Sequence, residues 1–193
     1  MSSLVVVTPP VDPVPSLEEV KAHLRQDFDE DDADLTSRIW GAITEFEDPN
    51  LGWLGRSILE RELELRLDGF CDVIDLPNGP ILQDGDYPFS IKYDDKDGVE
   101  QTLSSAVYYL ADPETRACRI LRKPRQSWPT VSGEANCVRI RYWAGYPADD
   151  VRINNFKSAV KLHVEMTYDG TTEARERLSE TIDRLLQPYR VYR

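Results

Sequence analysis

The sequence has few of the residues on which catalytic and metal-binding sites usually depend. Its 193 residues include two histidines and three cysteines. Cys71, Cys118 and Cys137 are odd in number and widely spaced, and no CxxC pair is present. The pattern therefore predicts neither a disulfide framework nor a zinc site. We interpret the three cysteines as small, buried, apolar side chains.

Sequence motifs for catalysis are missing too. His23 and His163 lie on predicted helices far apart in the sequence, and there is no HExxH, GxSxG, Walker loop or GxGxxG after a strand. Asp94, Asp95 and Asp97 lie in a predicted hairpin tip, where turn formation explains them. We therefore predict no catalytic residue, no cofactor and no metal site, and we do not expect an enzyme. An acidic metal-dependent hydrolase with Asp or Glu ligands is the alternative.

Long apolar runs and a signal sequence are absent as well. No stretch approaches the roughly 18 apolar residues that span a bilayer. The opening MSSLVVVTPP has neither the basic start nor the long apolar centre of a secretory signal. We expect a protein that is made and used without crossing a membrane.

Basic residues are outnumbered by acidic ones. The chain has 35 acidic and 23 basic residues, and its net charge is −12. Because like charges repel, such a surface opposes non-specific binding to phosphate backbones. The content of 40% hydrophobic and 30% charged residues is that of a folded protein, and at this length we expect one compact body with two lobes.

The first 56 residues predict an arm followed by two helices. Residues 1–15 contain four prolines, so we interpret them as an extended arm with little room for regular structure. Ser16 and Glu19 form a predicted capping box that begins a helix ending near residue 26. The acidic run DFDEDDAD at 27–34 fails the calcium-loop template, and we interpret it as a turn whose last members cap the next helix. That helix carries an apolar stripe from Leu35 to Phe46.

The stretch SILERELELRLD, residues 57–68, predicts the first strand of a β region. Leucines alternate with charged residues, which is the period of a half-buried strand. DDKDG at 94–98 predicts a hairpin turn. Further strands are predicted at 73–76, 87–93, 99–103, 107–110, 118–121 and 137–143. Short strands separated by frequent turns indicate a small antiparallel sandwich or barrel.

After the β region the sequence returns to helices and ends in an aromatic, basic segment. One helix is predicted with Asp149 or Asp150 as its cap, and another begins at Thr171 or Thr172. The segment after this last helix comprises Pro188, Tyr189, Arg190, Val191, Tyr192 and Arg193. It alternates like a strand, and Tyr and Arg concentrate binding energy at interfaces. We predict that it is a docking tail, and an end without a function is the alternative.

The four tryptophans have two interpretations. Trp40, Trp53, Trp128 and Trp143 fit core anchors or subunit contacts in a chain of this size. A ligand groove lined by them is the alternative. We expect the first.

Six parts of the sequence, taken in order, carry a family resemblance. They are PVPSLEEVKAHLRQDFDEDDADL, RSILERELELRLDGF with IDLPNGPI, SIKYDDKDGVEQTL, SWP at 127–129, VRIRYWAGY at 138–146 and LLQPYRVYR at the end. Together they resemble the head-tail connector proteins of tailed phages, also called adaptor or head-completion proteins, in the long form with an inserted β-domain. The segment EDPNLGWLGR, at 47–56, departs from the smoother helix-to-TGR passage of that family.

The resemblance implies a fold and a location. The implied fold class is α+β, a four-helix bundle made from N-terminal and C-terminal helix pairs with an antiparallel β-sandwich or barrel-like domain inserted between them. The implied location is the neck of a virion, between capsid and tail, after synthesis in the bacterial host cytoplasm. The expected parts are an arm at 1–15, a helical pair at 16–56, a β-domain at 57–146, a second helical pair at 147–187 and a docking tail at 188–193.

The resemblance also implies partners. Copies of a structural virion protein are expected to form a homo-oligomeric ring, commonly of twelve, beneath the portal protein, with the C-terminal tail docked on the portal. The ring would present a surface for a stopper or tail-completion protein, and genomic DNA would pass through an acidic lumen without specific binding. Another virion assembly part, such as a tail-completion or baseplate protein, is the alternative.

Overall fold

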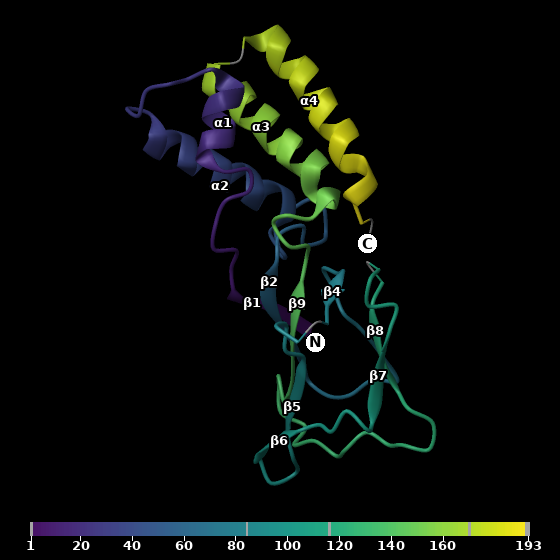
Figure 1. The fold of residues 1–193 in the computed structure, drawn as a ribbon. Coiled ribbons are helices and arrows are strands. Elements are labelled where there is room, and N and C mark those ends of the chain that lie inside the picture. Colours follow the sequence, from purple (N-terminus) through teal and green to yellow (C-terminus); the bar gives the residue numbers. More distant parts are fainter. Residues whose placement is uncertain (1, 84, 116, 170, 192–193) are drawn as a thin grey trace. The chain divides into compact units, whose positions relative to one another are not determined.

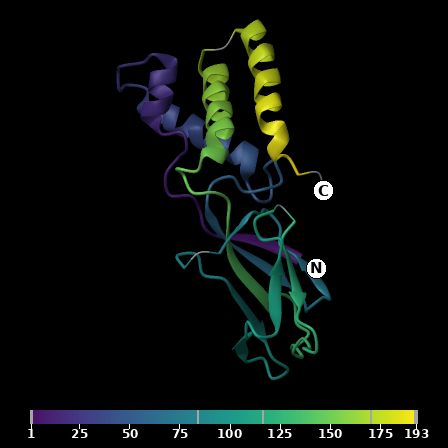
Figure 2. The same cartoon turned by 45° about the vertical axis from the view of Figure 1, so that its right-hand side comes forward.

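The chain divides into two compact units, each with its own hydrophobic core (Figure 1 and Figure 2). The sheet unit comprises Met1–Pro9 and Glu60–Gly145, and the helical unit comprises Pro10–Leu59 and Tyr146–Arg193. None of the described helices is both long and apolar enough to cross a membrane. The computed structural model describes residues 2–83, 85–115, 117–169 and 171–191.

The strands described in the sheet unit form two antiparallel sheets. The larger sheet has the strand order β1-β2-β9-β5-β6, and β4 also pairs with β9. The smaller sheet has the order β3-β8-β7. The strands are β1 (Ser2–Thr8), β2 (Arg61–Leu67), β3 (Val73–Asp75), β4 (Ile81–Leu82), β5 (Ser90–Asp94), β6 (Glu100–Thr102), β7 (Tyr108–Ala111), β8 (Arg119–Arg122) and β9 (Val138–Ala144).

Alternation along β2 and β9 explains how the sheet unit acquires its core. Leu63 pairs with Tyr142 and Leu65 pairs with Ile140, and all four side chains are buried. The intervening charged residues lie on the other face of the sheet, because successive side chains of a strand point to opposite sides. The predicted strand in SILERELELRLD is therefore confirmed over Arg61–Leu67.

β1 and β4 are strands that the sequence does not predict. Ser2–Thr8 belongs to the segment expected to lack regular structure, yet it pairs antiparallel with β2. The physical reason is that the prolines begin only at Pro9, so the preceding residues keep the amide N–H groups that a strand needs.

In the described residues of the helical unit there are four α-helices and two short 3₁₀-helices. Ser16 and Glu19 form the predicted capping box at the start of the first helix, so that prediction is confirmed. Asp150 and Thr171 accept capping hydrogen bonds from the amides of Arg152 and Ala174. The elements are α1 (Leu17–Leu24), α2 (Asp32–Glu47), η1 (Val151–Ile153), α3 (Asn154–Asp169), α4 (Thr172–Leu186) and η2 (Gln187–Tyr189).

The acidic turn before α2 differs from its prediction. Asp31 occupies the N-cap position but makes no capping hydrogen bond with its side chain. Its carboxylate instead accepts a hydrogen bond from the hydroxyl of Tyr168 on α3. Asp29 and Asp32 pair with the ammonium group of Lys21 on α1. The acids of this turn therefore tie helices together, and Asp32 and Asp34 face the positive end of α2.

The predicted fold class, a four-helix bundle made from N-terminal and C-terminal helix pairs with an inserted β-sandwich or barrel, is wrong. The helices are arranged around α3 of the C-terminal part, because α2 packs more extensively on α3 than on the eight-residue α1. Among the described residues, α4 packs along α3 and touches no other α-helix. The strands form two separate sheets, and the first strand comes from the N-terminus of the chain.

Candidate functional site

The C-terminal segment predicted to be a docking tail lies against the helical unit as far as Val191. The chain leaves α4 at Leu186 and turns through η2, which contains Pro188. The amide N–H of Val191 then donates a hydrogen bond to the carbonyl oxygen of Leu54, at 2.8 Å. Tyr192 and Arg193, which complete the predicted tail, lie outside the described residues.

Two side chains add to this backbone contact. Tyr189 is half-buried against the core of the helical unit, and its hydroxyl donates to the carbonyl oxygen of Arg152. Burial raises the pKa of the Tyr189 phenol, so the hydroxyl keeps the proton that it donates. The guanidinium carbon of Arg190 lies 5.2 Å from the centroid of the Trp53 ring, which is a cation–π distance.

The loop Trp53–Gly55 is the seat on which the tail rests. Its backbone is fixed because the amides of Trp53 and Leu54 donate to carbonyls near the end of α2. Gly55 has φ +68°, and a Cβ atom placed there would lie 3.0 Å from the carbonyl oxygen of Val191. A side chain would therefore be strained and would press on the tail. This loop belongs to the segment where the sequence departs from the connector family.

A buried carboxylate fixes the chain that follows this loop. Glu47, the last residue of α2, is fully buried, and its Oε2 accepts hydrogen bonds from the amides of Ile58 and Leu59. The N···O distance to Leu59 is 2.8 Å. The sequence gives no sign of this role, because the contact joins residues 12 positions apart across a loop. The glycines at 52 and 55 were the available signal that the loop is closely packed.

A surface pocket lies beside the tail. Its volume is about 360 Å³. The lining combines an indole ring with carboxylates and guanidinium groups, and comprises Trp53, Glu180, Asp183, Arg184, Gln187 and Arg190. Such a mixed lining suits polar side chains of a protein partner better than an apolar ligand.

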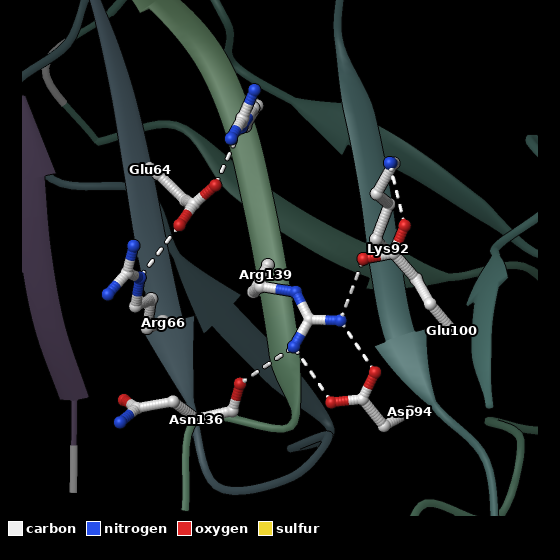
Figure 3. A network of polar contacts seen from close by, with 8 residues as sticks. Glu64, Arg66, Lys92, Asp94, Glu100, Asn136 and Arg139 are labelled. Atoms are coloured by element: carbon white, nitrogen blue, oxygen red, sulfur yellow. Dashed lines mark hydrogen bonds and ion pairs between the residues drawn. The ribbon is translucent and has the colours of Figure 1, made fainter. Parts of the chain in front are cut away.

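The outer face of the larger sheet carries a network of ion pairs (Figure 3). Glu64 on β2 accepts hydrogen bonds from Arg66 at 2.7 Å and from Arg141 on β9 at 2.6 Å. Its side chain is only 3% exposed. Burial raises the pKa of Glu64, but the two guanidinium groups outweigh this and hold it below its ordinary value of 4.5.

The same network continues across β5 and β6. Arg139 on β9 donates to both carboxylate oxygens of Asp94, at 2.6 and 2.8 Å, and to Glu100 at 3.0 Å. Lys92 also donates to Glu100, at 2.8 Å. The hydrogen bonds to Asp94 raise the pKa of Arg139, and those from Lys92 and Arg139 lower the pKa of Glu100. These acids are therefore committed to structural pairs.

The carboxylates of the predicted hairpin tip form the turn. Asp95 accepts hydrogen bonds from the amides of Asp97 and Val99, and Gly98 has φ +77°. The predicted hairpin turn is confirmed. Over residues 2–83, 85–115, 117–169 and 171–191, no group of three or more His, Cys, Asp or Glu side chains could hold a metal ion.

The fold brings together histidines and acids that are distant in the sequence. The Nε2 atom of His23 on α1 lies 2.8 Å from Oε2 of Glu165 on α3. The Nε2 atom of His163 on α3 lies 3.4 Å from Oε2 of Glu45 on α2. Burial lowers the pKa of His163. These pairs join helices, which the sequence spacing did not predict.

The cysteines and tryptophans lie mainly in or against the cores. Cys118 and Cys137 are buried as predicted, and burial raises the pKa of Cys118 to about 11. The prediction is wrong for Cys71, which is exposed. Trp40 and Trp53 pack against the core of the helical unit, and Trp128 packs against that of the sheet unit. The ring centroids of Trp143 and Tyr87 lie 5.6 Å apart.

Sequence comparisons give no family for this chain. No protein-family model matches it, and a search of curated proteins found no match. Solved structures do match. A chain in the neck of an empty gene transfer agent particle, computed with C6 symmetry, aligns with a TM-score of 0.74 and 22% identity, over 99% of this chain and 96% of that one.

Two further structures support the same fold. A chain in the virion of a native gene transfer agent particle aligns with a TM-score of 0.72 and 22% identity, over 98% of this chain and 96% of that one. A chain in the neck of a native particle, computed with C12 symmetry, aligns with a TM-score of 0.71 and 21% identity, over 99% of this chain and 96% of that one. At such identities the likeness shows a shared fold. The neck is also the location that the family resemblance implies.

Proposed function

We propose that this protein is a structural part of the neck of a phage-like particle, where copies of it form a ring between capsid and tail. The supporting observation is the likeness to a chain of a gene transfer agent neck over 99% of this chain and 96% of that one. A match of this extent includes both the sheet unit and the helical unit. It is therefore more specific than a likeness in one common motif.

The proposed ring has twelve copies. Its support is that one neck structure with this fold was computed with C12 symmetry, while another was computed with C6 symmetry. A ring of six would favour the alternative, a tail-completion or baseplate part on the tail side. Native mass spectrometry of the assembled protein distinguishes the two, because the masses differ twofold. A chain that stays monomeric at every concentration would contradict the ring.

The proposed role in DNA passage rests on charge. A net charge of −12 makes the close approach of phosphates unfavourable, so DNA would slide through the ring without adhering. The competing function, an acidic metal-dependent hydrolase, has no supporting geometry, since the described residues contain no candidate metal-ligand group.

We also propose that Pro188–Arg193 contacts the portal protein, while a stopper or tail-completion protein binds another surface of the ring. Pro188 and Arg190 are exposed, although Tyr189, Val191 and the guanidinium of Arg190 contact their own subunit. Residues 188–191 would then meet the portal as an ordered surface, which lowers the entropy lost on binding.

Co-sedimentation with purified portal rings tests the tail. Deletion of Pro188–Arg193 is expected to abolish binding, and Arg190→Glu is expected to weaken it. Arg175→Glu is the matched control, because it makes the same charge change at an exposed position of α4 outside the tail. Circular dichroism verifies that each variant is folded. Undiminished binding by the deletion variant would contradict the docking role and leave the ring proposal standing.

A further inference from the structure

The larger sheet has one long open edge, formed by β1. One side of β1 pairs with β2, and no other strand within the described ranges pairs with its second side. The strand is seven residues long and contains no charged residue and no proline. Leu4, Val5, Val6 and Val7 form its middle, and Val7 is 36% exposed. The unpaired N–H and C=O groups of such an edge are a template for another strand.

The other sheet edges in the described residues are guarded. β6 has three residues, and its Glu100 is held in ion pairs with Lys92 and Arg139. In the smaller sheet, β3 has three residues and β7 has four. Short strands and charged side chains are the usual means by which proteins prevent pairing between sheet edges. β1 has neither of these two protections, and its one irregularity is the register shift between Val6 and Thr8, which leaves the pairing of Ser2–Val6 with β2 regular.

We infer that the open edge of β1 is a subunit interface, at which an extended segment of a second copy of this chain adds a strand. The inference rests on the proposed ring and identifies one of its contacts. Each copy carries a net charge of −12, so copies approach one another at least electrostatic cost where the surface has no charge. The uncharged edge of β1 meets this condition.

Ring symmetry restricts which part of the second copy binds. Pairing of β1 with β1 would be isologous and would close a dimer, whereas a ring needs a head-to-tail contact between two different surfaces. The added segment therefore comes from outside β1 of the neighbouring copy. Main-chain hydrogen bonds give such strand addition its affinity.

Val7 is the position at which the edge can be altered with least effect on the fold. Leu4 and Val6 pack against the core of the sheet unit, and Val5 pairs across the strands with Glu64. The register between β1 and β2 is irregular between Val6 and Thr8, so Val7 has no cross-strand partner. A lysine there adds the charge that natural edge strands use to prevent pairing.

The test compares Val7→Lys with Val73→Lys in the full chain. Val73 lies on β3 and is 45% exposed, so the control makes the same chemical change on a strand of the other sheet. Native mass spectrometry over a concentration series is expected to show ring assembly weakened at least about tenfold for Val7→Lys and unchanged for the control. Circular dichroism verifies folding. Hydrogen exchange of the unmodified ring is expected to show new protection of amides between Leu4 and Val7.

The possible results test the β1 edge interface and the proposed ring separately. The edge interface is overturned if Val7→Lys assembles like the unmodified protein, or if the ring forms without new protection of amides in β1. Either outcome leaves the proposed function intact. An unmodified chain that stays monomeric at all concentrations overturns both. Weakened assembly of Val73→Lys to the same degree would show that the effect is not confined to the edge of β1, and it would also overturn the interface.

Discussion

At the scale of single residues, Glu64 shows how a polar position in a regular pattern can become buried. Its place in SILERELELRLD predicts an exposed charge, yet Arg66 and Arg141 cover it. Glu64→Gln removes charge-assisted hydrogen bonds, so we expect the free energy of unfolding of the sheet unit to fall by about 1–3 kcal/mol at neutral pH. Urea unfolding measures this, and Glu134→Gln at an exposed loop position is the control.

The same residue gives a prediction for pH. The pKa of Glu64 in the folded protein lies below its ordinary value of 4.5, so its contribution to stability is present above that value. The contribution is lost as the pH falls through the folded pKa. The difference between Glu64→Gln and the unmodified protein should therefore shrink as the pH falls below 4.5. A difference that stays constant until the protein unfolds in acid would contradict the ion-pair explanation.

Glu47 gives a prediction for the helical unit. Glu47→Ala leaves the buried amides of Ile58 and Leu59 without this acceptor, and we expect a loss of about 2–5 kcal/mol in the free energy of unfolding. Glu47→Gln keeps one acceptor oxygen and should cost less. Glu45→Ala, on the exposed side of the same helix, should cost about 1 kcal/mol or less. Chemical unfolding, monitored by circular dichroism, measures the loss of stability in each variant. Equal losses for Glu47→Ala and Glu45→Ala would refute the predicted ranking.

At the scale of elements, the contact between the tail and its seat can be isolated with two glycines. Gly55 and Gly98 both have positive φ, but only a Cβ atom at Gly55 would meet Val191, while one at Gly98 would have open space. Gly55→Ala should therefore release the tail, and Gly98→Ala should add only backbone strain. Hydrogen exchange at the amide of Val191 measures the release. Unchanged protection of this amide in Gly55→Ala would show that the seat does not hold the tail.

Local patterns explain which elements the sequence could predict. The capping box at Ser16 and the alternation in β2 depend on residues a few positions apart, so both were predictable. β1 was missed because LVVV at 4–7 shows no alternation and prolines follow it closely, so only its pairing with β2, more than 50 residues away, reveals the strand. The four-helix bundle was wrong because α4 buries only a narrow stripe, including Ile182 and Leu186, which one neighbouring helix covers.

The candidate site also has one part that the sequence could predict and one part that it could not. The composition of Pro188–Arg193 was enough to select it as a candidate docking tail, because aromatic and basic residues are unusual at the end of an acidic chain, and docking itself stays a prediction. Its seat was not predictable. Trp53, Leu54 and Gly55 meet the tail only through the fold of the helical unit, and no spacing in the sequence relates them to Val191.

At the scale of the whole molecule, the net charge of −12 governs how copies come together. If the main contact between copies is the uncharged edge of β1, salt should promote assembly, since it screens repulsion between like-charged subunits. We expect the ring to form at lower protein concentration when the ionic strength rises from about 0.01 M to about 0.5 M. Mass photometry at several salt concentrations measures this.

An uncharged solute separates screening from other effects of salt. Sucrose at matched osmolality strengthens the burial of surface without screening charge, so a response to sodium chloride that exceeds the response to sucrose is the electrostatic part. The opposite result, a ring that dissociates as salt is added, would show that ion pairs between copies hold it together. That result would also contradict the edge of β1 as the main contact, because a contact made by backbone groups and valines has no charge for salt to screen.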